Sequence, residues 1–298
     1  MEKESEFWYF LIQGEYIEEQ GAYGNFYSYG THCGDALEKT IQEAINQGLS
    51  NPVPIETARL DVLDEFELPE EAIKLAEEVY FKPPFHTFPF ADLEEDNYFV
   101  CPTGILKGTD NDEEEYELIK EGFTAFDKNE NGIYHLELVV SSENHVKTFF
   151  NAIDLLPTVD VFWLYIKQHW DGEQTELWAA STLYGKKSVV NFLSQNQNLT
   201  IENGYVDCVV HSKVGETNLT LDEHKKIQLH TKDETVFEEF MEGITESGFE
   251  QKTELPNIQY DFYHWHYRPA NSLTRNNFKA HLEAEGFELI DYWTDKVD

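Results

Sequence analysis

The sequence has few cysteines, few basic residues and no long apolar run. Its three cysteines, Cys33, Cys101 and Cys208, are odd in number and far apart in a chain of 298 residues. This spacing provides neither a disulfide framework nor a CxxC metal pair. No run of about eighteen apolar residues occurs, and Met1 is followed by an acidic stretch without a basic or apolar leader. These absences predict a soluble protein of the reducing cytoplasm.

The shortage of basic residues leaves a large excess of negative charge. The chain has 58 Asp and Glu residues against 21 Lys and Arg, which gives a formal net charge of −37. Such a charge repels nucleic acid and membrane phosphates and speeds encounters with basic partners. Surface carboxylates also keep a protein soluble without any partner. We therefore expect no direct binding of nucleic acid or membranes, and a basic protein is the partner that this charge favours.

The sequence also lacks the common catalytic motifs. GxSxG, the P-loop, GxGxxG and HExxH are all absent, and the carboxylates are too numerous for one acid–base pair to be singled out. A nucleophile can be argued only for Cys33, which follows His32 just before a predicted helix start at Asp35, where the helix dipole would lower the thiol pKa. The nearby Asp35 carboxylate opposes that effect. We expect no catalytic residue.

The N-terminal part predicts strands, a helix and a proline-rich link. FWYFLIQGEY from Phe7 and GNFYSYG from Gly24 have the aromatic content of two strands joined as a hairpin. Asp35 and Glu38 resemble a capping box, and apolar residues at helical spacing follow as far as Gly48. A short helix is predicted from Pro69 to Tyr80. The prolines of the following KPPFHTFPF run predict a link and not a regular element.

The remaining chain alternates strands and helices, which predicts an α+β fold of antiparallel sheets with helices on one face. FMEGITESGFE from Phe240 and FKAHLEAEGFE from Phe278 share their spacing, and in both a Gly suits the left-handed position after a helix. These patterns favour repeated ferredoxin-like β-α-β units. The acidic DNDEEE run predicts a domain junction. We predict an N-terminal α+β domain, a second α+β domain with β-α-β-β units and a ferredoxin-like C-terminal domain, over residues 1–112, 113–220 and 221–298.

The stretch from Leu221 to Trp293 resembles the regulator of ribonuclease activity B family. The features that carry the resemblance are the Gly248-Phe249-Glu250 sequence after a helix, an aromatic strand YDFYHWHYR ending at Arg268, and the terminal IDYW ending at Trp293. The resemblance implies a ferredoxin-like domain in a protein inhibitor or regulator. It further implies that this protein binds a basic segment and has no catalytic activity of its own.

Two patterns are typical of metal sites but are incomplete. His264 and His266 lie two apart in a predicted strand and therefore share one face, but a third ligand cannot be chosen among the other strand histidines, His135, His169, His211 and His230. DKNENG from Asp127 resembles a calcium loop, but Leu138 stands where the closing Glu is needed. Asn131-Gly132 instead favours a type I′ hairpin turn. We expect no bound metal or cofactor.

The predicted strand from Tyr260 to Arg268 places aromatic rings together on the face opposite the histidines. Aromatic side chains and arginine are the usual anchors of protein interfaces. We therefore select as binding residues Tyr263, Trp265, Tyr267, Arg268 and Trp293. The leading hypothesis is an acidic, non-catalytic binding protein, such as an inhibitor, an immunity factor or a regulator, that associates with a basic protein partner. The alternative is a metal-dependent or hydrolytic enzyme that uses the His264/His266 strand and nearby carboxylates.

Overall fold

A computed structural model describes residues 5–17, 20–60, 68–89, 99–107, 119–170, 174–261 and 264–294 of the chain. The chain divides into two compact units. Unit 1 comprises residues 1–92 and 107–113, and unit 2 comprises residues 93–106 and 114–298. The predicted junction at the DNDEEE run lies outside the described residues. Among the described helices, none is both long and apolar enough to cross a membrane.

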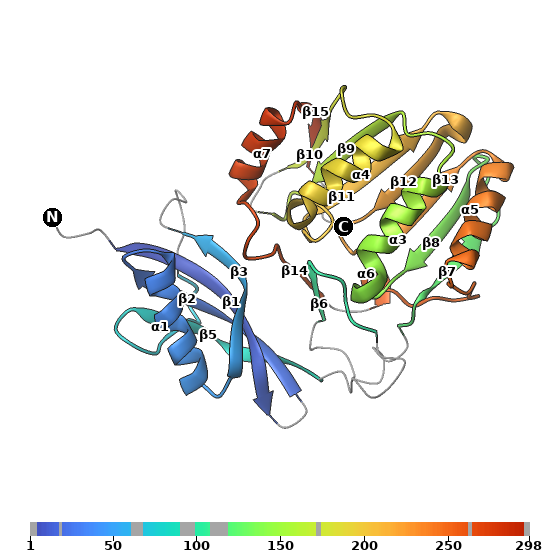
Figure 1. The fold of residues 1–298 in the computed structure, drawn as a ribbon. Coiled ribbons are helices and arrows are strands. Elements are labelled where there is room, and N and C mark those ends of the chain that lie inside the picture. The colour runs from blue at the N-terminus through green and yellow to red at the C-terminus, as the bar shows by residue number, and fades with distance from the viewer. Residues whose placement is uncertain are drawn as a thin grey trace. The chain divides into compact units, whose positions relative to one another are not determined.

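Unit 1 is a five-stranded antiparallel sheet that carries one long helix (Figure 1). The sheet order is β3-β1-β2-β5-β4, and the bounds are β1 (Glu6–Ile17), β2 (Gln20–Gly30), β3 (Ser50–Arg59), β4 (Ile73–Lys74), β5 (Val79–Pro89) and α1 (Cys33–Asn46). Phe10 and Phe26 face each other across the β1–β2 hairpin and are fully buried against α1. The predicted hairpin and the predicted helix are both confirmed.

The proline-rich segment of unit 1 differs from its prediction. The predicted helix from Pro69 to Tyr80 is absent, and β4 and the long strand β5 occupy the region instead. Strand β5 pairs with β2, and Phe81 stacks on Phe26 with ring centroids 4.8 Å apart. The register shifts on β2 between Tyr23 and Asn25, opposite the two consecutive prolines. This irregularity lets the strand continue past residues that have no amide donor.

The start of α1 also differs from its prediction. His32 and not Asp35 is the N-cap, and the His32 Nδ1 accepts a hydrogen bond from the Asp35 backbone N–H at 3.2 Å. Burial, with a smaller contribution from Glu6, raises the pKa of the Cys33 thiol. The thiol is therefore not activated, because burial and the Glu6 carboxylate both disfavour the thiolate.

Unit 2 is built on an eight-stranded sheet in which every neighbouring pair is antiparallel. The order is β15-β10-β9-β11-β12-β13-β8-β7. The bounds are β7 (Gly122–Phe126), β8 (Tyr134–Val139), β9 (Val161–Ile166), β10 (Thr175–Ala179), β11 (Val206–Ser212), β12 (Thr217–Leu221), β13 (Ile227–Thr231) and β15 (Glu288–Trp293). A separate two-stranded sheet pairs β6 (Ile105–Lys107) with β14 (His264–His266).

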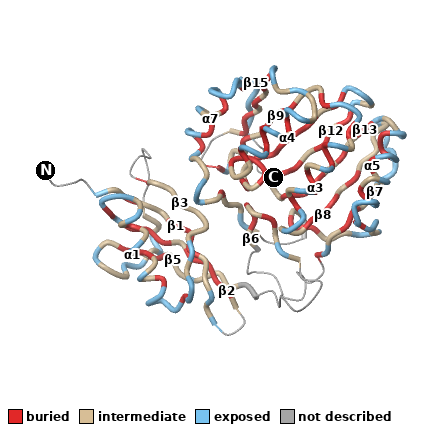
Figure 2. The backbone as a smooth tube through the Cα atoms, viewed as in Figure 1, coloured by how far each residue is buried: buried red, intermediate tan, exposed pale blue. Residues whose placement is uncertain are grey.

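The helices of unit 2 cover one face of the large sheet (Figure 1). They are α3 (Ser142–Leu155), α4 (Lys186–Gln195), α5 (Glu234–Glu246) and α7 (Arg275–Ala284); short helical turns are η1 (Gln197–Leu199), η2 (Val214–Glu216) and α6 (Ile258–Asp261). Alternate strand residues such as Leu136, Phe162 and Leu219 are fully buried beneath them, as the red segments in Figure 2 show. The predicted α+β fold with antiparallel sheets is confirmed.

Two further details of unit 2 depart from the sequence prediction. The predicted boundary at residues 220/221 falls inside β12, because the hairpin partners β11 and β13 extend one sheet across it. The predicted strand over residues 260–268 is shortened to His264–His266, and a turn of helix, α6, precedes it. The hairpin at DKNENG is confirmed. Its turn is not type I′, because Gly132 has a positive φ of 78° and Asn131 does not.

Candidate metal centre

His264 and His266 lie on β14 with their rings close together. Because side chains alternate along a strand, both project from the same side of the two-stranded sheet, as the sequence predicted. Their Nε2 atoms are 3.2 Å apart. Two nitrogens bound to one zinc ion at about 2.0–2.1 Å in tetrahedral geometry would be about 3.3 Å apart. The two Nε2 atoms share a hydrogen bond, and their separation also fits two ligands of one ion.

The backbone around β14 is held in place by close approach to a glycine. The Tyr267 N–H donates to Gly104 O at 2.8 Å, and the Gly204 N–H donates to Tyr267 O at 2.9 Å. A Cβ on Gly204 would lie 2.1 Å from Gly104 O, which leaves no room for any side chain. Only glycine permits these three segments to pack so tightly. This packing holds β14, and with it the two histidines, against the segments at Gly104 and Gly204.

The third imidazole, His224, comes from the turn between β12 and β13. The Asp222 Oδ1 accepts the Lys226 N–H at 2.9 Å across this turn, and Lys225 has a left-handed φ of 65°. The Lys225 side chain points inward, where its Nζ donates to Asn203 O at 2.6 Å. These contacts connect the turn to the segment at Asn203. They leave the His224 ring 4.9 Å, centroid to centroid, from the rings of both His264 and His266.

The histidines form two overlapping sets of possible ligands. In the first set, His224, His264 and His266 have their ligand atoms within 4.8 Å of one another. In the second set, His169, Glu223 and His266 meet the same criterion. His169 lies in the turn that follows β9. All these residues belong to unit 2, so the site is complete within one compact unit.

One hydrogen bond decides which nitrogen of His266 is available. Its Nδ1 lies 2.6 Å from Gly204 O, and a carbonyl can only accept, so Nδ1 carries the proton. Histidines that bind metals commonly donate their second nitrogen to a backbone carbonyl in this way. Nε2 is then the nitrogen with a lone pair to offer. The two ligand sets are therefore alternatives for one ion and not a binuclear pair.

Two imidazoles of the site, those of His224 and His266, are neutral. Burial, followed by the neighbouring His266 and His264, lowers the pKa of His224 to about 2. Burial, followed by His169 and His264, lowers the pKa of His266 to about 3. A histidine must lose its proton before it can bind a metal. The protein environment has already imposed that state on His224 and His266.

A group of buried charges lies beneath the histidines. Lys167 Nζ is 3.2 Å from Glu223 Oε1 and 3.4 Å from Asp207 Oδ2. Burial disfavours the charge of Lys167, but the two carboxylates outweigh that effect and raise its pKa. Burial also raises the pKa of Glu223 to about 8, against the opposing effect of Lys167. The Glu223 Oε2 accepts no hydrogen bond from a described residue and lies 3.3 Å from His169 Nε2. It is a buried acceptor that faces the cluster.

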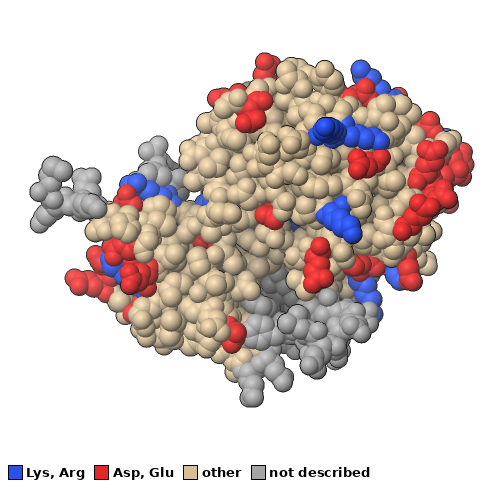
Figure 3. All heavy atoms as spheres, viewed as in Figure 1, with Lys and Arg blue, Asp and Glu red and all other residues tan. Residues whose placement is uncertain are grey.

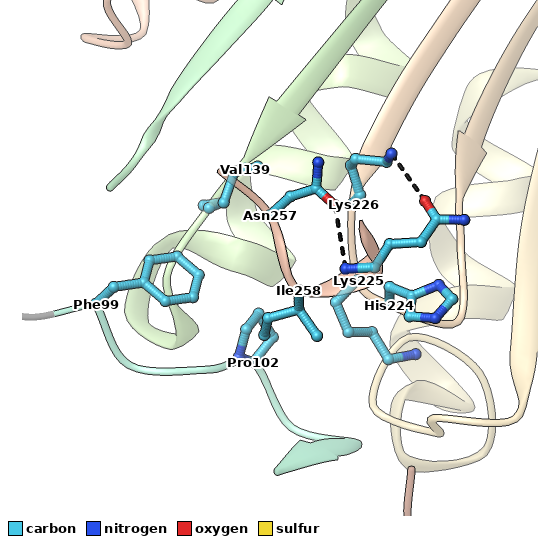
Figure 4. A pocket seen from close by; sticks show the side chains of 10 residues that line it. Phe99, Pro102, Val139, His224, Lys225, Lys226, Asn257 and Ile258 are labelled. Atoms are coloured by element: carbon cyan, nitrogen blue, oxygen red, sulfur yellow. Dashed lines mark hydrogen bonds between the residues drawn. The ribbon is translucent and has the colours of Figure 1, made fainter. Parts of the chain in front are cut away.

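A small cavity of about 10 Å³ adjoins His224, with space for about one water molecule. The apolar side chains of Phe99 and Pro102 lie on one side and the imidazole of His224 on the other (Figure 4). At the polar end of the cavity, Lys226 Nζ donates to Gln259 Oε1 at 2.9 Å. The structure therefore provides a pocket with mixed lining next to one of the candidate ligands.

The sequence revealed half of this cluster. It placed His264 and His266 on one face, and His169 was among the candidate third ligands. His224 was not among them, because it lies in a polar turn where no strand pattern draws attention to it. The other candidates lie elsewhere: His135 stacks on His230 with centroids 4.2 Å apart, and His211 is hydrogen-bonded to Asn218.

The residues selected from sequence as binding anchors do not form one group. Tyr263 lies outside the described residues. Trp265 is exposed on β14, Tyr267 is half-buried, and Arg268 is buried with its Nη1 3.5 Å from Ser272 Oγ. Trp293 lies on β15, where its ring meets Tyr165 edge-on at 5.7 Å.

Comparison with protein-family models, curated proteins and solved structures finds no match to this chain.

Proposed function

We propose that this protein holds one divalent transition-metal ion between His224, His264 and His266 and uses it to activate a bound water molecule. The observation that carries the proposal is the convergence of these three imidazoles, with the Nε2 atoms of His264 and His266 at ligand spacing. This proposal replaces the sequence-based expectation that no metal is held. It develops the alternative hypothesis of a metal-dependent or hydrolytic enzyme.

The donor set indicates which ions fit. Imidazole nitrogen suits zinc, copper, nickel and iron, whereas magnesium and calcium take oxygen ligands. Three histidines on zinc leave a fourth coordination position for water, and the ion lowers the pKa of that water to about 7. His169 and Glu223, which share His266 with this set, would adjoin the remaining coordination position. This arrangement supports hydrolysis of a small substrate.

Binding is tested with protein stripped by a chelator and then titrated with Zn²⁺ or Co²⁺. We expect one ion per chain by calorimetry and the visible absorption of tetrahedral Co²⁺. His224→Ala, His264→Ala and His266→Ala should each weaken binding by about tenfold or more, since even outer partners of metal ligands contribute about 10–100-fold. The matched control is the double variant His135→Ala/His230→Ala, which removes two half-buried imidazoles elsewhere in unit 2.

Two results would refute the centre: no stoichiometric ion, or equal affinities for the control and the ligand variants. The open position is tested separately with His169→Ala, which should change affinity by less than about threefold if three histidines suffice. If His169→Ala lowers metal affinity as much as His224→Ala does, His169 is a fourth ligand and the site is closed and structural. The role in water activation would then be dropped. Metal-dependent cleavage of a chromogenic ester provides the activity assay.

A second candidate function is association with a basic protein. It is favoured by the exposed face of α5, which presents Glu234, Glu238, Glu239, Glu242 and Glu246 without a Lys or Arg in the helix. Figure 3 shows acidic side chains crowded at that edge of unit 2. Salt-sensitive binding of polylysine tests this candidate. The ferredoxin-like arrangement and the resemblance to the regulator of ribonuclease activity B family remain predictions that agree with it.

A further inference from the structure

We propose that the outer edge of β15 takes up an extended basic segment of a partner protein as an added strand. This inference goes beyond the metal centre. It rests on the second candidate function and names the surface, the binding mode and the chemistry of the partner. Strand addition of this kind uses backbone hydrogen bonds for affinity and alternate side chains for specificity.

The open edge is the first observation. β15 ends the sheet order and pairs with β10 alone among the described strands. Every residue of β15 is exposed, and the four large apolar side chains, Leu289, Ile290, Tyr292 and Trp293, are 38–58% exposed. An edge strand presents a row of backbone donors and acceptors that another strand can pair with.

The opposite edge of the same sheet shows what a covered edge looks like. On β7, the Phe123 N–H donates to Glu250 O at 3.0 Å, and the Lys252 N–H donates to Phe123 O at 2.8 Å. Both backbone groups of Phe123 are thus paired with the segment at Glu250–Lys252. Within the described residues, no such segment covers β15. Among the described residues, the chain pairs with the β7 edge at Phe123 and does not pair with the outer edge of β15.

Charge selects the occupant. The segment from Glu283 to Trp293 contains Glu283, Glu285, Glu288 and Asp291 and no Lys or Arg. None of these four carboxylates forms an ion pair with a described residue. The nearby cations Arg275 and Lys279 are engaged by Glu176. Two copies of β15 would place like charges side by side, which is unfavourable, so a basic segment fits and a second copy does not.

Apolar contacts add specificity to the charge. The register between β10 and β15 shifts at Ile290, which has no partner on β10 and leaves its side chain exposed. Beyond the shift, Tyr292 and Trp293 continue the strand and expose ring surface of the kind that anchors interfaces. The expected partner segment therefore alternates basic and apolar residues. Glu288 and Asp291 pair with Ala179 and Leu177 and share one face, which basic residues can meet, while Leu289 and Tyr292 lie on the other face, where apolar residues can meet them.

The test uses three synthetic eight-residue peptides: alternating lysine and valine, alternating glutamate and valine, and the lysine peptide with a proline at its centre. We expect the lysine peptide to bind one per chain in about 50 mM salt, the glutamate peptide not to bind, and the proline peptide to bind at least about tenfold more weakly. Fluorescence anisotropy of labelled peptide measures all three.

The location of the site is tested with the variants Ile290→Lys and Tyr292→Lys. Each is expected to weaken binding of the lysine peptide by about tenfold or more. The matched controls are Ile17→Lys and Tyr184→Lys. Ile17 and Ile290 are both 58% exposed, and Tyr184 and Tyr292 are 66% and 57% exposed. The controls add the same charge, so they should weaken binding only about two- to threefold.

The outcomes separate the two levels of the proposal. If all four variants weaken binding equally, association depends on net charge alone; the second candidate function stands and the β15 site is dropped. If the lysine peptide does not bind, both are dropped. If the chain forms a dimer that Ile290→Lys abolishes, the occupant is a second copy and the basic partner is refuted.

Discussion

Arg275 should be the most important single cation for the stability of unit 2. It lies at the start of α7, and its side chain is 7% exposed. Its Nη1 donates to Lys167 O at 2.5 Å and Trp170 O at 2.8 Å, while Nη2 donates to Gln174 O at 2.7 Å and Glu176 Oε1 at 3.1 Å. One guanidinium therefore satisfies the ends of the segment that joins β9 to β10.

We expect Arg275→Met to destabilise unit 2 by about 3–5 kcal/mol, because removing one partner of a buried ion pair leaves the other charge without full compensation. Three carbonyl oxygens would also lose their donors. The methionine fills much of the volume, so the loss reflects polar groups and not a cavity. For a unit of this size, each kcal/mol of lost stability lowers the Tm by about 2–4 °C, so the Tm of unit 2 should fall by roughly 6–20 °C.

The pH dependence follows from the partner Glu176. Burial opposes its ionisation, but hydrogen bonds from Lys279, Trp178 and Arg275 outweigh burial and hold its pKa below the ordinary value of 4.5. A carboxyl with a depressed pKa in the folded state contributes stability above its unfolded pKa and loses it as the pH falls through the folded pKa. The wild type should thus exceed Glu176→Gln in free energy of unfolding by its largest margin at pH 7, and this margin should shrink below about pH 4.5.

Urea unfolding followed by tryptophan fluorescence measures both effects, with the two units fitted as separate transitions. The matched control is Arg59→Met in unit 1, whose pair with Glu6 at 3.1 Å is more exposed. That pair should contribute at most about 1 kcal/mol. A loss below about 1 kcal/mol for Arg275→Met, or a Glu176→Gln difference that does not change between pH 7 and pH 3, would refute the reasoning.

Three further predictions concern other parts of the chain. Gly204→Ala should weaken metal binding by about tenfold and destabilise unit 2 by about 1–3 kcal/mol, because its Cβ would displace the backbone beside β14; calorimetry with Zn²⁺ checks this. Glu242→Lys should stabilise unit 2 by about 0.5–1 kcal/mol in thermal unfolding, since it places a cation four residues from both Glu238 and Glu246. Limited proteolysis should cut within residues 94–117 and release a folded C-terminal fragment, because the chain changes from one unit to the other within this region. Uniform degradation without a stable fragment would contradict the last prediction.

Local patterns predicted the elements that depend on neighbouring residues. Apolar spacing and a terminal glycine predicted the helix that ends before Gly48 and the two helices that end before Gly248 and Gly286. All three glycines have positive φ values, between 84° and 105°. A helix satisfies its hydrogen bonds within itself, so its ends are encoded locally.

Strands were predicted less well where pairing is distant in sequence. The KPPFHTFPF run has the composition of a link, but β2 supplies partners that let it extend as β5. The run over residues 260–268 has the composition of a long strand, but β6 offers it only a short partner. In both cases the available neighbour decided the outcome, and sequence composition does not encode which neighbour is available.

The candidate centre was half-visible in the sequence for the same reason. Alternation along a strand is a local rule, and it is sufficient to place His264 and His266 together on one face. His224 joins them only because the turn between β12 and β13 and the β6–β14 sheet both meet the segment at Asn203 and Gly204, through the Lys225 and Tyr267 contacts. That meeting depends on sheet order, which no spacing of histidines reveals. A ligand set drawn from a strand and a turn of different hairpins leaves no contiguous motif. Such a set should therefore be sought among histidines in turns as well as on strands.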